Sequence, residues 1–331
     1  MIKFLLVRVA SMIGIVLLLV FVMFVLQRVT PVDPVRAKLG SNASKQAVAT
    51  ERHRLGYDDP LPVQYVNYVD DLVHGNLQES LRTRRPVVDD IGAYLPATME
   101  LAFFGLVFAL IMGGALGIAS AAKFRGSGVF RVVLIFGASA PVFLLALLGL
   151  ILFYRNLGWL PATGRTSIAN APDGPTGFLT FDGILHGRLD VTWDAFQHLL
   201  MPALCIAIGS AVAIGRVLRG SLIGNLHSDY IRTARAKGLR ERTVMFKHAL
   251  RNSVGPALSM TGLQVGLMFA GVVVVETIFA WGGLGQYIVQ SIPRADFPAI
   301  AGVTLLLGVG YVVINTIIDI LQSLADPRIR L

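Results

Sequence analysis

The stretch SVGPALSMTGLQVGLMFAGVVVV, residues 253–275, contains no acidic or basic side chain in 23 positions. An α-helix rises 1.5 Å per residue, so about 20 residues cross the hydrocarbon core of a membrane, which is about 30 Å thick. Lipid offers no water to satisfy an open sheet edge, so a spanning segment of this kind folds as a helix. The stretch therefore predicts a membrane-spanning α-helix.

Similar uncharged runs recur along the 331-residue chain, at Val9–Gln27, Leu101–Ala122, Val132–Tyr154, Ala195–Gly215 and Phe297–Ile318. Charged residues make up 15% of the sequence, whereas a soluble domain carries about 25%. The first run is too long for the core of a secretion signal, so we expect it to be retained. Together the six runs predict an all-α polytopic membrane protein with six spanning helices.

Basic residues gather on one set of connecting loops. The segment DYIRTARAKGLRERTVMFKHALRN, Asp229–Asn252, carries seven Lys or Arg and two Asp or Glu, and residues 122–131 carry three basic residues and no acidic one. Only Arg294 is basic between Trp281 and Asp296. Short basic loops stay in the cytoplasm, so we expect both termini and Asp229–Asn252 on the cytoplasmic side.

The net charge of +9 is therefore mainly an orientation signal. No aromatic residues alternate with the basic ones to form a platform for bases, so we expect no nucleic-acid binding. The sequence lacks a phosphate-binding G-x-x-x-x-G-K-[ST] loop, a His-Glu-x-x-His zinc motif and a G-x-S-x-G nucleophile motif, and Cys205 is its single cysteine. We expect no catalytic residue, metal site or cofactor in this chain.

Two polar regions are expected to fold outside the membrane. Residues 230–237 and 242–250 favour helix, with Gly238 as the break between them. In the long outer loop, PVQYVNYVDDLVHGNL places apolar residues at helical spacing, with Asp70 and Asp71 on the opposite face. That helix packs on the membrane or the bundle, or it contacts a partner outside the membrane.

Ionisable groups inside the spans are the usual mark of a transport path, because burying them in lipid is costly. Glu276 and Asp319 border the fifth and sixth runs, where they line a path or lie at the membrane surface. We take Gln264, Met268 and Glu276, in or near the fifth run, as candidates for the lining. His198, at the outer end of the fourth run, is expected to pack rather than to bind a ligand.

The basic segment resembles the EAA loop of binding-protein-dependent ABC importer permeases. The general pattern is Glu-Ala-Ala, three residues, Gly, nine residues and Ile-x-Leu-Pro, of which Ala234, Gly238 and Leu250 match. DYIRTARAKGL followed by HALRN resembles the variant of the dipeptide and oligopeptide subfamily. LGYDDPLPVQY, SLRTRRPV, LPATMELA, GWLPATG, ETIFAWGGLGQ and DPRIRL resemble the first permease subunit of that subfamily, and residues 35–54 match it least.

The resemblance implies the type I ABC importer permease fold in a bacterial inner membrane. It implies residues 1–29 as the N-terminus and first span, 30–96 as an extracytoplasmic cap, and 97–331 as the core, with its coupling loop at 229–252. The partners would be membrane lipid, a second homologous permease that completes the path, two cytoplasmic subunits that bind ATP and Mg²⁺, and an extracytoplasmic peptide-binding protein. The loop residues implied in coupling are Tyr230, Arg232, Thr233, Ala234, Lys237, Gly238, Leu239, His248 and Leu250. Among them, we expect Ala234 to pack in a groove of the ATPase.

Other readings remain open. Relatives with the same architecture carry nickel chelates, glutathione or oligosaccharides. A secondary carrier would place ionisable relays within the spans and would need no loop for a motor; the sequence lacks the relays and has the loop. An intramembrane enzyme would need a nucleophile with its base, or a metal set, within the spans, and the runs contain neither.

Overall fold

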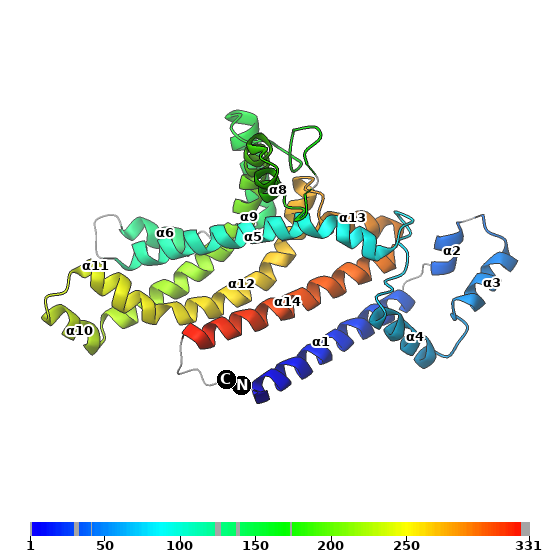
Figure 1. The fold of residues 1–331 in the computed structure, drawn as a ribbon, viewed down its shortest axis with the longest axis horizontal. Helices are drawn as coiled ribbons and strands as arrows, with labels where there is room; N and C mark the ends of the chain where they lie inside the picture. Colours follow the sequence, from blue (N-terminus) through cyan, green and yellow to red (C-terminus); the bar gives the residue numbers. More distant parts are fainter. Residues whose placement is uncertain are drawn as a thin grey trace. The chain divides into compact units, whose positions relative to one another are not determined.

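The computed structural model describes residues 2–29, 33–40, 42–122, 127–136, 140–172 and 174–325, and these residues are helical apart from loops and one isolated bridge between Glu79 and Pro86 (Figure 1). This confirms the predicted all-α class. The α-helices are α1 Ile2–Val29, α2 Pro34–Leu39, α3 Lys45–Arg54, α4 Leu61–Val73, α5 Val87–Ala121, α6 Ser127–Phe136, α7 Val142–Gly149, α8 Leu179–Leu185, α9 Leu189–Leu226, α10 Asp229–Ala236, α11 Glu241–Thr243, α12 Leu250–Ile278, α13 Leu284–Ser291 and α14 Phe297–Ala325. Two π-helical stretches are η1 Leu150–Asn156 and η2 Val244–Ala249, and η3 Ile292–Arg294 is a 3₁₀ turn.

Five helices within the described residues are long and apolar enough to cross a membrane. They are Val9–Val29, Val87–Ala121, Leu189–Leu226, Glu241–Ile278 and Phe297–Ile318. Each covers all or nearly all of one predicted run, because a continuous apolar stretch of this length favours a helix in lipid.

The third predicted span is the exception, because the structure does not make Val132–Tyr154 one uninterrupted helix. Helix α6 ends at Phe136, and α7 begins at Val142 after Pro141, whose backbone is extended with ψ 144°. Proline has no N–H to donate and disfavours helix in the residue before it. The apolar helix that follows, Val142–Asn156, is too short to rank with the other five.

The chain divides into two compact units. Unit 1 comprises residues 1–95 and 283–312, and unit 2 comprises residues 96–282 and 313–331. The units are sets of residues in mutual contact, so the segments 1–29, 30–96 and 97–331 inferred from sequence stay a prediction.

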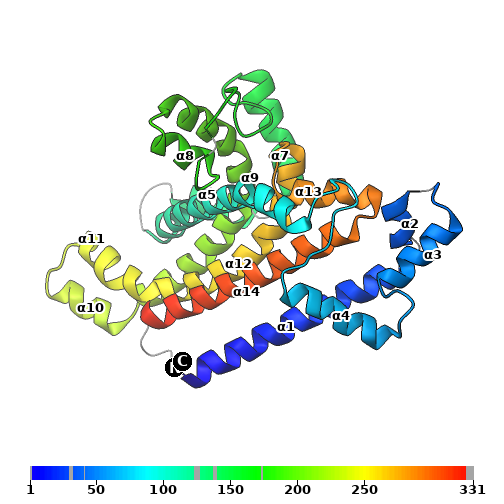
Figure 2. The ribbon, with the colours of Figure 1, turned by 45° about the vertical axis from the view of Figure 1, so that its right-hand side comes forward.

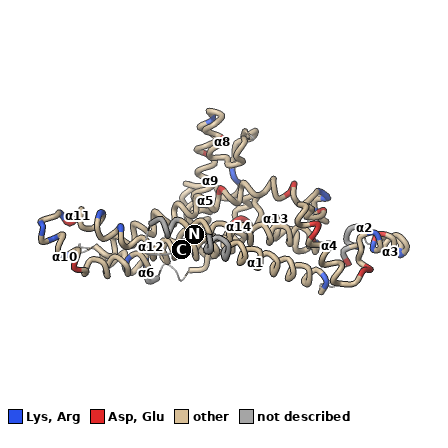
Figure 3. Tube along the Cα trace, turned by 60° about the horizontal axis from the view of Figure 1, so that its bottom comes forward, with Lys and Arg blue, Asp and Glu red and all other residues tan. Residues whose placement is uncertain are grey.

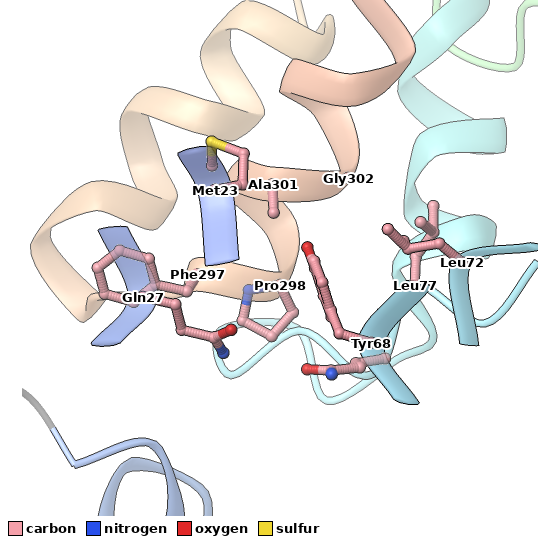
Figure 4. A pocket seen from close by; sticks show the side chains of 10 residues that line it. Met23, Gln27, Tyr68, Leu72, Leu77, Phe297, Pro298, Ala301 and Gly302 are labelled. Atoms are coloured by element: carbon pink, nitrogen blue, oxygen red, sulfur yellow. The ribbon is translucent and has the colours of Figure 1, made fainter. Parts of the chain in front are cut away.

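In unit 1, the predicted helix of the outer loop is present as α4 and packs against α1. The Phe24 ring lies 5.4 Å from the Tyr65 ring and 6.0 Å from the Tyr68 ring, between centroids. Burial raises the pKa of Tyr68 to about 12. Figure 4 shows Met23, Tyr68 and Phe297 around the small space between these helices and α14, and its volume of 10 Å³ is too small for a ligand.

Unit 1 also contains a buried polar network built on SLRTRRPV, residues 80–87. The Ser80 hydroxyl donates to Asp296, and the backbone N–H of Arg82 donates to the same carboxylate at 3.0 Å. The Tyr287 hydroxyl donates to Asp90 at 2.9 Å, and the Arg82 guanidinium lies 4.9 Å from the centre of the Tyr287 ring. Both carboxylates are buried and hydrogen-bonded, as buried charges must be, so this motif joins the start of α5 to α13.

In unit 2, helices α5, α7, α9 and α12 enclose the main apolar cluster. Helices α5 and α9 approach closely at two glycines. A Cβ on Gly113 would lie 2.8 Å from the carbonyl oxygen of Ala211, and one on Gly117 would lie 3.0 Å from that of Gly215. Small residues at such crossings allow tight backbone packing, which is the main source of helix association in lipid.

Candidate functional site

The basic segment 229–252 folds as a helical hairpin at one end of unit 2. Helix α10 follows α9, and α11 leads through η2 into α12, so the hairpin projects from the ends of two long helices (Figures 1 and 2). The predicted pair of helical stretches separated at Gly238 is confirmed. The second stretch, however, is no separate helix but the beginning of the helix that continues to Ile278.

Gly238 shapes the turn of the hairpin. Its φ is +74°, a left-handed conformation that side chains with a Cβ disfavour. A Cβ built on it would meet no atom within 4 Å, so the constraint comes from the backbone and not from crowding. An ion pair between Arg235 and Glu241, with Nε and Oε1 2.7 Å apart, bridges the two arms of the turn.

The inner face of the hairpin is apolar. Ile231 and Ala234 of α10 are buried in one cluster with Val244 and Ala249 of η2 and with Leu222 of α9. The Ala234 side chain is 7% exposed, so it faces its own chain and not an open surface where an ATPase groove would meet it. Any part that Ala234 plays in coupling therefore acts through packing inside the hairpin.

The other predicted coupling residues occupy the outer face or its edge. Tyr230, Arg232, Thr233, Lys237, Gly238 and Leu239 are exposed, whereas His248 and Leu250 are half-buried. The hairpin thus combines an inner face that fixes its shape with an outer face available to a partner.

Two polar residues outside the prediction join the hairpin to the long helices. The side-chain amide of Asn225, near the end of α9, donates to the Ser253 hydroxyl at 2.9 Å, and its oxygen accepts from the Tyr230 hydroxyl at 3.1 Å. Ser253 is fully buried and donates to the Ala249 carbonyl. The position of Asn225, four residues before the basic segment, was the available signal, because an amide can both donate and accept at a helix junction.

The residues predicted to line a path lie on α12. Glu276 is fully buried and accepts a hydrogen bond from the Thr98 hydroxyl at 2.6 Å, which joins α12 to α5. Met268 is buried and borders an apolar cavity of 180 Å³ together with Phe103. Gln264 is half-buried and its amide lies near the Met260 sulfur. Their part in a path stays a prediction, and the side chain of Asp319 lies outside the described residues.

The sequence reasoning missed Glu100, a second buried carboxylate of unit 2. Arg165 donates to it at 2.6 Å, and the backbone and hydroxyl of Thr180 donate at 2.9 and 2.7 Å. The Trp281 indole donates to the Ala97 carbonyl at 2.9 Å. This network brings together LPATMELA, ETIFAWGGLGQ and the arginine that follows GWLPATG. A charge directly before an apolar run was the signal for it.

His198 and Cys205, two residues of α9 singled out in the sequence, are both buried. His198 is buried and its Nδ1 lies 3.1 Å from the Gly164 carbonyl, so it packs as expected. Cys205 is free and buried. Within the described residues, no group of three or more His, Cys, Asp or Glu side chains could hold a metal ion.

Comparison with known proteins identifies the family. Residues 105–331 match the binding-protein-dependent transport system inner membrane component, and residues 1–102 match the N-terminal region of such membrane components. The chain belongs to this family. The resemblance read from the motifs is thereby confirmed, and the chain is a polytopic inner-membrane component of a transport system.

Several curated relatives of this transport component are similar over 91% or more of their length. The dipeptide transport system permease protein of Alkalihalophilus pseudofirmus is 39% identical over 98% of both chains. The probable D,D-dipeptide transport system permease protein of Escherichia coli is 40% identical over 92% of this chain and 91% of its own. The glutathione transport system permease protein of Salmonella typhimurium is 33% identical over 100% of this chain and 99% of its own.

Proposed function

We propose that this chain is the permease subunit of an ATP-driven importer of dipeptides and oligopeptides. It forms half of the translocation pathway with a second, homologous permease, and it has no catalytic residue of its own. ATP and Mg²⁺ bind to two cytoplasmic partner subunits, and an extracytoplasmic binding protein delivers the peptide. The observation that carries the proposal is the 229–252 hairpin, a polar projection tied to two long apolar helices.

The hairpin has the contacts that a coupling element needs. Helix α10 packs on η2, the turn is closed by the Arg235 to Glu241 ion pair, and Asn225 connects the end of α9 to Ser253 at the start of α12. A displacement of α10 is therefore passed to both long helices. Binding and hydrolysis of ATP by the docked subunits would shift the helix bundle between two conformations.

The peptide cargo is supported by the relatives. The dipeptide permeases are 39% to 41% identical to this chain, whereas the glutathione permease is 33% identical. Glutathione is itself a peptide, so it is the second cargo to test. A secondary carrier is disfavoured because the hairpin would then have no partner to couple to.

Reconstitution tests the proposal. The chain would be placed in proteoliposomes with a homologous second permease and ATP-binding subunits from the same organism, with the binding protein outside and ATP inside. We expect uptake of labelled dipeptide that requires ATP and every subunit, with glutathione competing weakly. Uptake by this chain alone, or uptake driven by a proton gradient without ATP, would overturn the proposal.

A further inference from the structure

Phe246 is the most exposed large apolar side chain of the basic segment. It lies in η2, and 56% of it is accessible, against 40% for Tyr230 and 39% for Leu239. Single exposed apolar residues are common on proteins and carry no argument by themselves. Two further features set this one apart.

The first feature is the backbone that exposes it. Buried positions of this helix occur at Val244, Ala249, Ser253 and Ala257, so the first step is five residues and the following steps are four. The five-residue step coincides with the π-helical turn η2. In an ordinary α-helix, a step of three or four residues back from Ala249 would bury Phe246 or its neighbour. The π turn instead buries Val244 and directs Phe246 outward, and such turns are frequent at functional sites.

The second feature is the charge around it. Arg242, Lys247 and Arg251 lie within one turn or so of Phe246 and are exposed. In the part of the segment that the structure describes, the ion pairs join Arg232 to Asp229 and Arg235 to Glu241, and these three cations have no acidic partner. Figure 3 shows Lys and Arg residues gathered at the end of unit 2 that contains α10 and α11.

We propose that Phe246 inserts into an apolar pocket with an acidic rim on the cytoplasmic ATP-binding subunit, and that Arg242, Lys247 and Arg251 pair with that rim. This inference rests on the proposed function, because it names the contact through which the hairpin meets the ATPase. Aromatic residues, Phe included, and Arg are enriched at protein interfaces relative to the rest of the surface, and Phe246 with Arg242 and Arg251 has this composition.

A lipid surface fits the position less well than a protein does. Phe246 precedes the uncharged run by seven residues, which is about 10 Å of helix. The charged Lys247 and Arg251 lie between it and that run. The side chain therefore lies beyond the hydrocarbon, where a protein pocket can bury it and the lipid tails cannot.

The test measures binding of the ATP-binding subunits used in that reconstitution to the permease pair held in phosphatidylcholine nanodiscs. We expect Phe246→Ala to weaken binding at least about ten-fold, as for a dominant interface residue, and Phe246→Leu to retain most of the affinity. Lys247→Glu should slow association several-fold at low salt, with the difference shrinking at high salt. The matched control is Leu185→Ala on α8, at the opposite end of α9, where Leu185 is 63% exposed; it should bind as the unaltered chain does.

The possible outcomes distinguish a failure of the Phe246 inference from a failure of the proposed function. If the unaltered pair binds the ATPase and Phe246→Ala binds within two-fold of it, this inference is wrong and the proposed function stands. If the unaltered pair does not bind the ATPase at all, the proposed function fails. If Phe246→Ala has an effect only in nanodiscs that contain phosphatidylglycerol, the side chain serves the lipid and the inference is also overturned. Gel filtration and the rate of trypsin cleavage exclude misfolding as the cause of a loss.

Discussion

At the scale of single residues, buried charges mark where unit 2 is held together. Glu100 is 1% exposed and accepts from Arg165 and Thr180, so its desolvation is offset by one ion pair and two hydrogen bonds. A buried ion pair adds little to the free energy of unfolding compared with well-packed apolar residues in its place. Removing only one partner lowers that free energy strongly, because the other charge stays buried without a partner.

We expect Glu100→Gln to lower the free energy of unfolding by about 3 kcal/mol, the lower end of the range for broken buried pairs, since Arg165 keeps 21% of its side chain exposed. The double variant Glu100→Gln with Arg165→Gln should recover part of that loss. Thermal unfolding of the purified chain in detergent measures both. Equal stability of the single variant and the unaltered chain would mean that the pair is dispensable.

Ala234 offers a second test at this scale, with a control on the same helix. Ala234→Glu places a carboxylate in the apolar cluster of the hairpin, which costs about 1–3 kcal/mol for overpacking and more for the unpaired charge. Ala236→Glu makes the same change at an exposed position. We expect faster trypsin cleavage within 229–252 and loss of ATP-dependent uptake for the first variant alone. If both variants transport normally, the segment is only a basic membrane anchor.

At the scale of elements, prolines and glycines decide where the apolar and polar patterns break. Pro141 interrupts the third predicted span, and Gly238 turns the hairpin. The interruption at Pro141 was not predicted, because a count of uncharged residues does not take account of the missing N–H of proline. The second break was visible because glycine falls between two stretches that favour helix.

The turn at Gly238 can be tested without adding a clash, since no atom lies within 4 Å of a built Cβ. A side chain with a Cβ in left-handed backbone costs about 1–2 kcal/mol, and Asn tolerates this region better than Val. We therefore expect Gly238→Val to reduce ATP-dependent uptake strongly and Gly238→Asn to preserve most of it. Indistinguishable uptake by the two variants would show that the backbone conformation of the turn does not matter for coupling.

At the scale of the whole molecule, orientation follows from the short basic loops and is open to direct measurement. In a Cys205→Ala background, Arg240→Cys should resist a membrane-impermeant maleimide in sealed spheroplasts, because the predicted topology places the hairpin in the cytoplasm. Leu185→Cys, exposed on α8, should be labelled. The reverse labelling pattern would invert the predicted topology and remove the basis for docking a cytoplasmic ATPase on the hairpin.

The class of this protein, five of its long helices and the polar hairpin with its glycine turn were predictable from residue patterns alone. Length and the absence of charge suffice for this, since the cost of an unpaired backbone group in lipid leaves a helix as the only fold for an apolar run. Family membership was also readable, because the motifs are local in sequence.

Which side chains face inward became known from the folded chain. Ala234 faces the interior of the hairpin, and Glu276 is buried and accepts a hydrogen bond from Thr98. Glu100 pairs with Arg165, which lies 65 residues away in the sequence. The π turn at Val244–Ala249, which directs Phe246 outward, was also not predicted from the sequence. Contacts between distant segments depend on how the helices pack against one another. Local patterns in the sequence, such as apolar runs and helix breaks, do not show which helices will be neighbours.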